Sequence, residues 1–239
     1  MATAFARVKQ IMRHSSAATR AAGAWLAIAS VLLAIVFVFH GPPEHHVADQ
    51  MTVIARESAR WVAVHWMAAV ALSLFAMAGL IILGAGSRLT ASGWTISAWA
   101  LLPVGALWTL VTAVAEATAV TNAAVAGNKE DFAAWWAFSE GFGNGFAGLA
   151  LCVAVIAANE MRAAEKATPA WASSVAVFAG IASFTGWTLW SWADLGFAAP
   201  FWVASSILMC AWLLWFGTGL VRAEGAHATG HLAQGEAAS

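Results

Sequence analysis

The chain has 239 residues, of which 62% are hydrophobic and only 10% are charged. Because an average soluble domain is about 25% charged, this composition excludes an ordinary soluble protein and favours lipid as the surrounding solvent. The formal net charge of −1, without any dense run of Lys and Arg, argues against nucleic acid as a partner.

The N-terminal segment, residues 1–20, is basic and precedes the first apolar run. This order also fits a signal peptide, but the basic part is long, and the exit sequence that begins at His40 lacks a small-x-small cleavage site. We therefore predict that residues 1–20 are a basic cytoplasmic segment in front of an uncleaved first helix.

Long apolar blocks occupy residues 21–222. An α-helix needs about 20 apolar residues to cross a hydrocarbon core about 30 Å thick. The sequence therefore predicts an all-α fold, a polytopic membrane bundle of about six transmembrane helices, at Ala21–Phe39, Trp61–Gly84, Trp94–Val120, Phe142–Ala158, Trp171–Trp190 and Phe201–Val221. Residues 40–60 and 121–141 are predicted to be polar loops on one side, and residues 223–239 a flexible cytoplasmic tail.

The basic residues predict the orientation of the bundle. Eight of the 11 Lys and Arg fall on the side of the two termini, and these residue types are enriched in cytoplasmic loops. We therefore expect both termini in the cytoplasm, at a bacterial cytoplasmic membrane. Tryptophans near the predicted span ends are interpreted as interfacial anchors: Trp25, Trp61, Trp94, Trp171, Trp190, Trp192 and Trp202.

Few ionisable residues fall inside the predicted spans, where each costs about 2.5–3.5 kcal/mol at the membrane centre. His65 and Glu116 lie about one turn inside the outer ends of the second and third spans. Glu140 and Asn144 open the fourth span, and Asp194 follows the fifth. We expect these groups at one depth in the outer half of the membrane, while the inner half is expected to be plain packing.

A polar stripe on the third span supports a pocket at this depth. Thr109, Thr112 and Glu116 are spaced i, i+3 and i+7, which places them on one helical face. We predict an outward-facing polar pocket for a ligand or ion, lined by His65, Thr112, Glu116, Glu140, Asn144 and Asp194. The alternatives are that Glu140 and Asp194 are solvated boundary residues and that His65 is a structural partner of Glu116.

The segment after the first span is rich in metal-ligating side chains. It contains His40, Glu44, His45 and His46, and imidazole and carboxylate groups bind zinc, copper or iron. Together with His65 and Glu116 they suggest a transition-metal site, although the spacing matches no established metal motif.

Three glycines in the fourth span form a stripe of small residues. Gly141 and Gly145 have GxxxG spacing, and Gly148 follows one turn later, so another helix can approach closely. Packing within the bundle is the first interpretation of this face. A homo-oligomer or another protein partner is the alternative, in addition to membrane lipid.

Three functional hypotheses follow. The first is a transporter, sensor or complex subunit that uses the outward-facing pocket. The second is an intramembrane metal-dependent enzyme that uses the His and Glu cluster, and the third is a structural accessory subunit. A retinal protein is excluded because every Lys lies outside the predicted spans, whereas enzymatic activity itself stays open.

Overall fold

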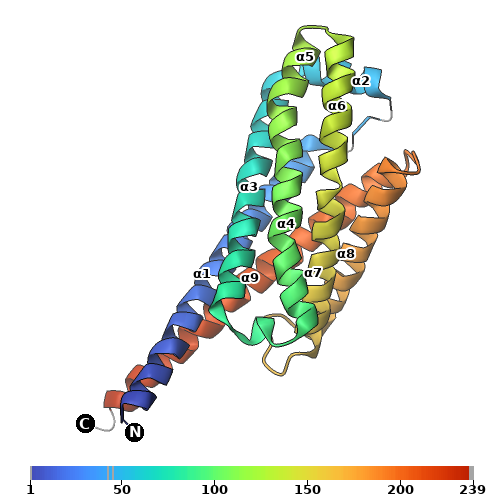
Figure 1. Cartoon of the computed structure of the whole chain (residues 1–239). Coiled ribbons are helices and arrows are strands. Elements are labelled where there is room, and N and C mark those ends of the chain that lie inside the picture. The colour runs from blue at the N-terminus through green and yellow to red at the C-terminus, as the bar shows by residue number, and fades with distance from the viewer. Residues whose placement is uncertain (1, 42, 45, 237–239) are drawn as a thin grey trace.

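The computed structural model describes residues 2–41, 43–44 and 46–236, and it describes side chains only within 17–222. Its described part is helical and contains no strand. Long helices form the bundle shown in Figure 1: α1 (Ala2–His40), α3 (Ser58–Ala85), α4 (Gly93–Ala115), α7 (Gly145–Arg162), α8 (Ala170–Ser191) and α9 (Ala198–Glu236). Helix α9 thus continues through most of the predicted tail.

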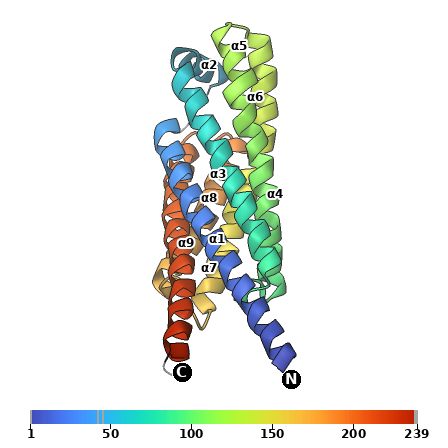
Figure 2. The ribbon, with the colours of Figure 1, turned by 90° about the vertical axis from the view of Figure 1, so that its left-hand side faces the viewer.

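These helices form a closed ring. Each packs against two neighbours, in the order α1, α3, α4, α7, α8 and α9, and the contact of α9 with α1 closes the ring. Both chain termini lie at the same end of the bundle, as Figures 1 and 2 show. We call this the terminal end, and the opposite end, where α1 finishes at His40, the far end.

The prediction of a six-helix membrane bundle is confirmed. Within the described residues, six helical segments are long and apolar enough to cross a membrane: Ala17–His40, Ser58–Ala85, Gly93–Val125, Lys129–Arg162, Ala170–Ser191 and Ala198–Arg222. Large apolar side chains such as Leu80, Val104 and Phe178 are exposed on the outside of the bundle. This surface is expected of a protein surrounded by lipid, because lipid tails are as apolar as these side chains and no hydrophobic effect favours their burial.

The prediction of a loop at residues 121–141 is wrong. The segment contains α5 (Thr121–Val125) and α6 (Lys129–Gly143), which lengthen α4 and α7 at the far end. The polar residues interpreted as a loop form only the turn, where Asn128 caps α6 by accepting a hydrogen bond from the backbone N–H of Asp131. The 40–60 segment likewise contains a helix, α2 (Val47–Arg56).

The far end has a small apolar core of its own. Ile54 of α2, Val120 in the π-helical turn that follows α4, and Phe132 and Trp136 of α6 pack with Trp61 of α3. This cluster is separate from the larger core that runs along the ring. The polar residues described below lie between the two cores.

Glycines allow close crossings of neighbouring helices. A Cβ atom at Gly217 of α9 would lie 2.5 Å from the carbonyl oxygen of Gly23 in α1, and one at Gly145 would lie 2.7 Å from that of Gly105 in α4. In contrast, Gly141 and Gly148 are exposed and face open space. Only Gly145 of the predicted stripe therefore packs inside the bundle.

Replacing Gly217 by Ala should weaken the contact that closes the ring. The new methyl group would overlap with the α1 backbone, so the two helices must move apart and lose packing. We expect a lower melting temperature of the detergent-purified protein. Gly84→Ala is the matched control, because a methyl group there meets nothing; an equal effect of both changes would contradict the close-crossing explanation.

Candidate functional site

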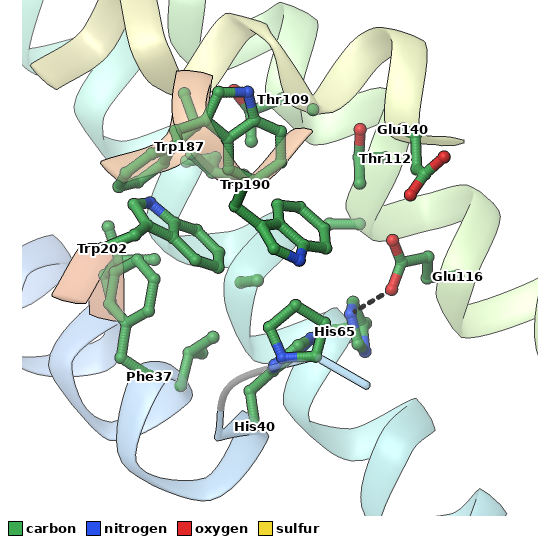
Figure 3. A pocket seen from close by; sticks show the side chains of 18 of the residues that line it. Phe37, His40, His65, Thr109, Thr112, Glu116, Glu140, Trp187, Trp190 and Trp202 are labelled. Carbon is green, nitrogen blue, oxygen red and sulfur yellow. Dashed lines mark ion pairs between the residues drawn. The ribbon is translucent and has the colours of Figure 1, made fainter. Parts of the chain in front are cut away.

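Three metal-ligating side chains from three helices meet at the far end. His40 ends α1, His65 lies in the second turn of α3, and Glu116 follows α4. One ligand atom from each lies within 4.8 Å of the other two. His65 and Glu116 are buried, and their Nε2 and Oε2 atoms are 2.8 Å apart. Figure 3 shows this pair beside His40 at the edge of a cavity.

The ring of His65 is held by its own helix. Its Nδ1 lies 2.8 Å from the carbonyl oxygen of Trp61, one turn earlier. Since a carbonyl oxygen only accepts hydrogen bonds, Nδ1 carries a hydrogen and Nε2 faces Glu116. The short Nε2–Oε2 contact then requires one more proton, which the imidazole and the carboxyl group share.

His40 is oriented in a similar way. Its Nδ1 lies 2.7 Å from the carbonyl oxygen of Gly41, so this nitrogen donates a hydrogen and Nε2 is the atom available to a ligand. The ring also packs against those of Trp61 and His65, at centroid distances of 4.6 and 5.1 Å. Both imidazoles of the cluster are thus fixed by a backbone carbonyl.

The end of α1 is tied to α3 next to His40. Arg60 donates a hydrogen bond from Nη1 to the carbonyl oxygen of Phe39, and its Nη2 lies 2.6 Å from Oε2 of Glu57. A hydrogen bond from Arg56 and the charge of Arg60 hold the pKa of the Glu57 carboxyl below its usual value. This ion pair therefore keeps Arg60 in place against the residue that precedes His40.

Glu116 lies where the helix changes its hydrogen-bonding pattern. It begins a π-helical turn, Glu116–Val120, and Thr121 donates its hydroxyl hydrogen to the carbonyl oxygen of Glu116 at 2.6 Å. Such turns often mark functional sites. The carboxylate is held from the other side by Ser139 of α6, whose Oγ donates to Oε1 at 3.1 Å. Oε2 is therefore directed to the histidines.

A cavity of about 100 Å³ adjoins the cluster. Its wall opposite Glu116 is aromatic: the rings of Trp190 and Trp202 are stacked, with centroids 5.9 Å apart and planes 6° from parallel, and Trp187 meets Trp202 edge-on. Figure 3 shows Trp190 between Trp202 and the His65–Glu116 pair. Two more rings complete this wall, those of Phe37 and Phe146.

The polar lining of the cavity is acidic. Glu116 and Glu140 supply two carboxyl groups, and none of the described lining residues is Lys or Arg. Thr109 and Thr112 also line the cavity, but their hydroxyl groups donate to the carbonyl oxygens of Gly105 and Ser139. The polar groups that line the cavity are thus chiefly carboxylate and imidazole groups.

The remaining predicted pocket residues lie elsewhere. Asn144 joins α6 to α7, where its Oδ1 accepts hydrogen bonds from the indole nitrogens of Trp187 and Trp192 at 3.0 and 2.9 Å. Asp194 is exposed in the turn after α8. Neither residue lines the cavity described above.

Among the described residues of the predicted metal-binding segment, only one reaches the cluster. His40 does, whereas Glu44 and His46 are exposed and are not part of it. His46 instead precedes the first residue of α2. His45 lies outside the described residues. The short spacing of Glu44 and His46 from His40 does not bring them together with it, because α2 begins at Val47 and leads the chain away.

Several residues at this site were missed by sequence reasoning. Trp202 is 7% exposed and Trp61 is 2% exposed, so the interpretation of these two as interfacial anchors is wrong. Ser139 carries no sequence signal at all, because its partner Glu116 is 23 residues away. The unusual Trp content, 15 residues without any Tyr, was the only available indication of an aromatic wall.

Towards the terminal end, the interior of the ring is filled. Trp99 of α4 stacks on Phe216 of α9 across the bundle, with centroids 6.4 Å apart, and both side chains are fully buried. Leu72 and Leu102 are buried in the same core. The cavity is thus backed by close packing on the side of the termini.

The ring of apolar helices defines the class of the chain: it is a polytopic integral membrane protein. Its site combines a buried His and Glu cluster with an aromatic-walled cavity at one end of the bundle. Comparison with protein-family models, curated proteins and solved structures finds no match to this chain. The functional argument therefore rests on the site itself.

Proposed function

We propose that this membrane protein binds a cation in the cavity at the far end of the bundle. The observation that carries the proposal is the buried contact between His65 and Glu116, whose Nε2 and Oε2 atoms are 2.8 Å apart. None of the described residues that line the cavity is a Lys or Arg that could neutralise Glu116. The sequence predicted a pocket for a ligand or ion, and we propose that this ligand is a cation.

Charge balance supports this proposal. A carboxylate inside a membrane protein is expensive unless a positive charge accompanies it. In the contact with His65, the shared proton supplies that charge. A cation that enters the cavity can take the place of this proton at Glu116. His65 then keeps only the hydrogen on Nδ1, which it donates to the carbonyl oxygen of Trp61. Glu140 on the same cavity supplies a second carboxyl group for a cation with two charges.

The filled interior of the ring supports binding over free conduction. Buried Trp99 and Phe216 meet across the bundle between the cavity and the terminal end. A cation held at Glu116 therefore reaches the terminal end only if these helices move. Sensing, or transport through alternating conformations, fits this arrangement, whereas an open channel does not.

The experiment is equilibrium dialysis of the detergent-purified protein against four separate probes: Na⁺, Mg²⁺, Zn²⁺ and tetramethylammonium. We expect at least one of them to bind at one equivalent per chain. The binding site is located with Ala68→Phe, which places a ring in the cavity without changing any charge, because Ala68 is buried and lines it.

Ala100→Phe is the matched control, since Ala100 is exposed on the outside of α4. We expect Ala68→Phe to weaken binding of the cation at least tenfold and Ala100→Phe to leave it unchanged. Melting temperatures of both variants show whether each is folded. The proposal is overturned if none of the four probes binds stoichiometrically, or if folded Ala68→Phe binds as tightly as the unchanged protein.

A further inference from the structure

We infer that His40, His65 and Glu116 form a binding site for a divalent transition-metal ion such as Zn²⁺, held by two imidazole Nε2 atoms and one carboxylate oxygen. This inference rests on the proposed cation-binding function and names the chemical class of the cation. Among the described residues, these three side chains form a group in which one ligand atom of each lies within 4.8 Å of the other two.

The spacing suits a metal ion. In a tetrahedral zinc site with bonds of about 2.0–2.2 Å, two ligand atoms lie about 3.4 Å from each other. The Nε2–Oε2 pair is somewhat closer than this, at 2.8 Å, and no pair in the cluster exceeds 4.8 Å. Binding of one ion by all three ligand atoms therefore requires side-chain rotations that bring them to the tetrahedral spacing.

Each ligand is oriented by a second contact, as in metal sites generally. His65 and His40 place Nδ1 on the carbonyl oxygens of Trp61 and Gly41, which leaves Nε2 of each ring available, and Nε2 of His65 faces Glu116. Ser139 donates to Oε1 of Glu116 and leaves Oε2 for the ion. Polar residues that came together by chance would not be expected to have all three side chains oriented by hydrogen bonds.

The donor atoms select the class of ion. Two imidazoles and one carboxylate suit Zn²⁺, Fe²⁺, Cu²⁺ or Ni²⁺, whereas Mg²⁺ and Ca²⁺ prefer oxygen ligands alone. Na⁺ gains little from imidazole nitrogen for the same reason. A quaternary ammonium ion would need aromatic faces spread around it, but Trp190 and Trp202 are stacked on each other with their planes 6° apart.

Three protein ligands leave at least one coordination position open. The cluster adjoins the aromatic-walled cavity, and Figure 3 shows Trp190 facing the histidine and glutamate side chains across it. The open position therefore faces a space large enough for water or another small ligand. A site of this kind binds an exchangeable ligand, in contrast to a four-ligand structural zinc site.

The test uses full-length protein that has been stripped with a chelator and then titrated with Zn²⁺ and, separately, with Co²⁺. We expect one equivalent of each ion, visible d–d absorption of bound Co²⁺, and loss of that absorption when Zn²⁺ displaces it. His40→Ala removes one ligand and should weaken Zn²⁺ binding by about 100-fold, and added imidazole should restore part of it.

His46→Ala is the matched control, because His46 is an exposed histidine six residues further along and is not part of the cluster. Its Zn²⁺ affinity should equal that of the unchanged protein. Ser139→Ala provides a second, milder variant, which removes only the hydroxyl that holds Glu116 and should weaken binding about tenfold. Melting temperatures without metal separate loss of ligand from loss of fold.

The outcomes separate this inference from the proposed function. If Na⁺, Mg²⁺ or tetramethylammonium binds in the cavity and Zn²⁺ and Co²⁺ do not, the metal inference is overturned while cation binding stands. If Zn²⁺ binds equally well to His40→Ala and His46→Ala, the metal is not held by this cluster. If no cation binds at all, both proposals fail.

Discussion

Replacing Glu116 by Gln should weaken cation binding by about 100-fold and leave the fold intact. The amide has nearly the same shape as the carboxyl group and can still accept the hydrogen bond from Ser139. It lacks the negative charge that a cation needs in this buried place. A 100-fold weaker affinity corresponds to about 2.7 kcal/mol of binding free energy.

The measurement is a Zn²⁺ titration of the purified variant, together with its melting temperature. Glu130→Gln is the control, because Glu130 is an exposed carboxylate at the start of α6. We expect the control to bind as the unchanged protein does. Unchanged affinity in Glu116→Gln would mean that Glu116 is only a structural partner of His65, the alternative that the sequence leaves open.

Replacing Glu160 by Ala should lower the free energy of unfolding of the protein more than any other substitution proposed here. Glu160 is 1% exposed at the terminal end of α7. Its carboxylate accepts hydrogen bonds from the backbone N–H groups of Ala167 and Thr168, and Arg88 donates to it at 3.1 Å. One side chain thus joins the connection between α3 and α4 to the connection between α7 and α8.

Without this carboxylate, the buried N–H of Thr168, the partly buried N–H of Ala167 and the guanidinium group of Arg88 lose an acceptor. We expect a cost of about 3 kcal/mol, since Arg88 is partly exposed and retains some solvation. Thermal unfolding in detergent measures the effect. Glu165→Ala changes an exposed carboxylate in the same connection and should have little effect; a similar melting temperature for both variants would contradict the structural role of Glu160.

Glu160 also adds a buried carboxylate at the terminal end of the bundle that the sequence did not indicate. It lies just beyond the predicted fourth span, so the hydrophobic pattern assigned it to the polar end of a helix. The orientation of its side chain depends on where the α7–α8 connection folds back. Nothing in the local sequence indicates that Ala167 and Thr168 return to it.

The membrane helices were predictable because their signal is local. A run of about 20 apolar residues is enough to predict a span, and each of the six predicted spans overlaps a helix of the bundle. The closed ring was not predictable, since the contact between α1 and α9 joins the two ends of the chain. Helix α6 was missed because its apolar run, residues 132–138, is too short to predict a span and is flanked by polar residues.

The candidate site was partly predictable because ionisable residues inside apolar runs are also a local signal. The cost of ionisable groups in lipid singled out His65 and Glu116, and the structure places them in direct contact. The partners that orient them could not be found in this way. Trp61 contributes a backbone carbonyl, which every residue has, and Ser139 is one of many serines in apolar segments.

Anomalous diffraction at the zinc edge, from crystals of the zinc-loaded protein, tests the central claim most directly. Our account predicts one strong peak per chain at the far end of the bundle, about 2.0–2.2 Å from Nε2 of His40, Nε2 of His65 and a carboxylate oxygen of Glu116. A zinc peak at other residues, and no peak between His40, His65 and Glu116, would contradict it.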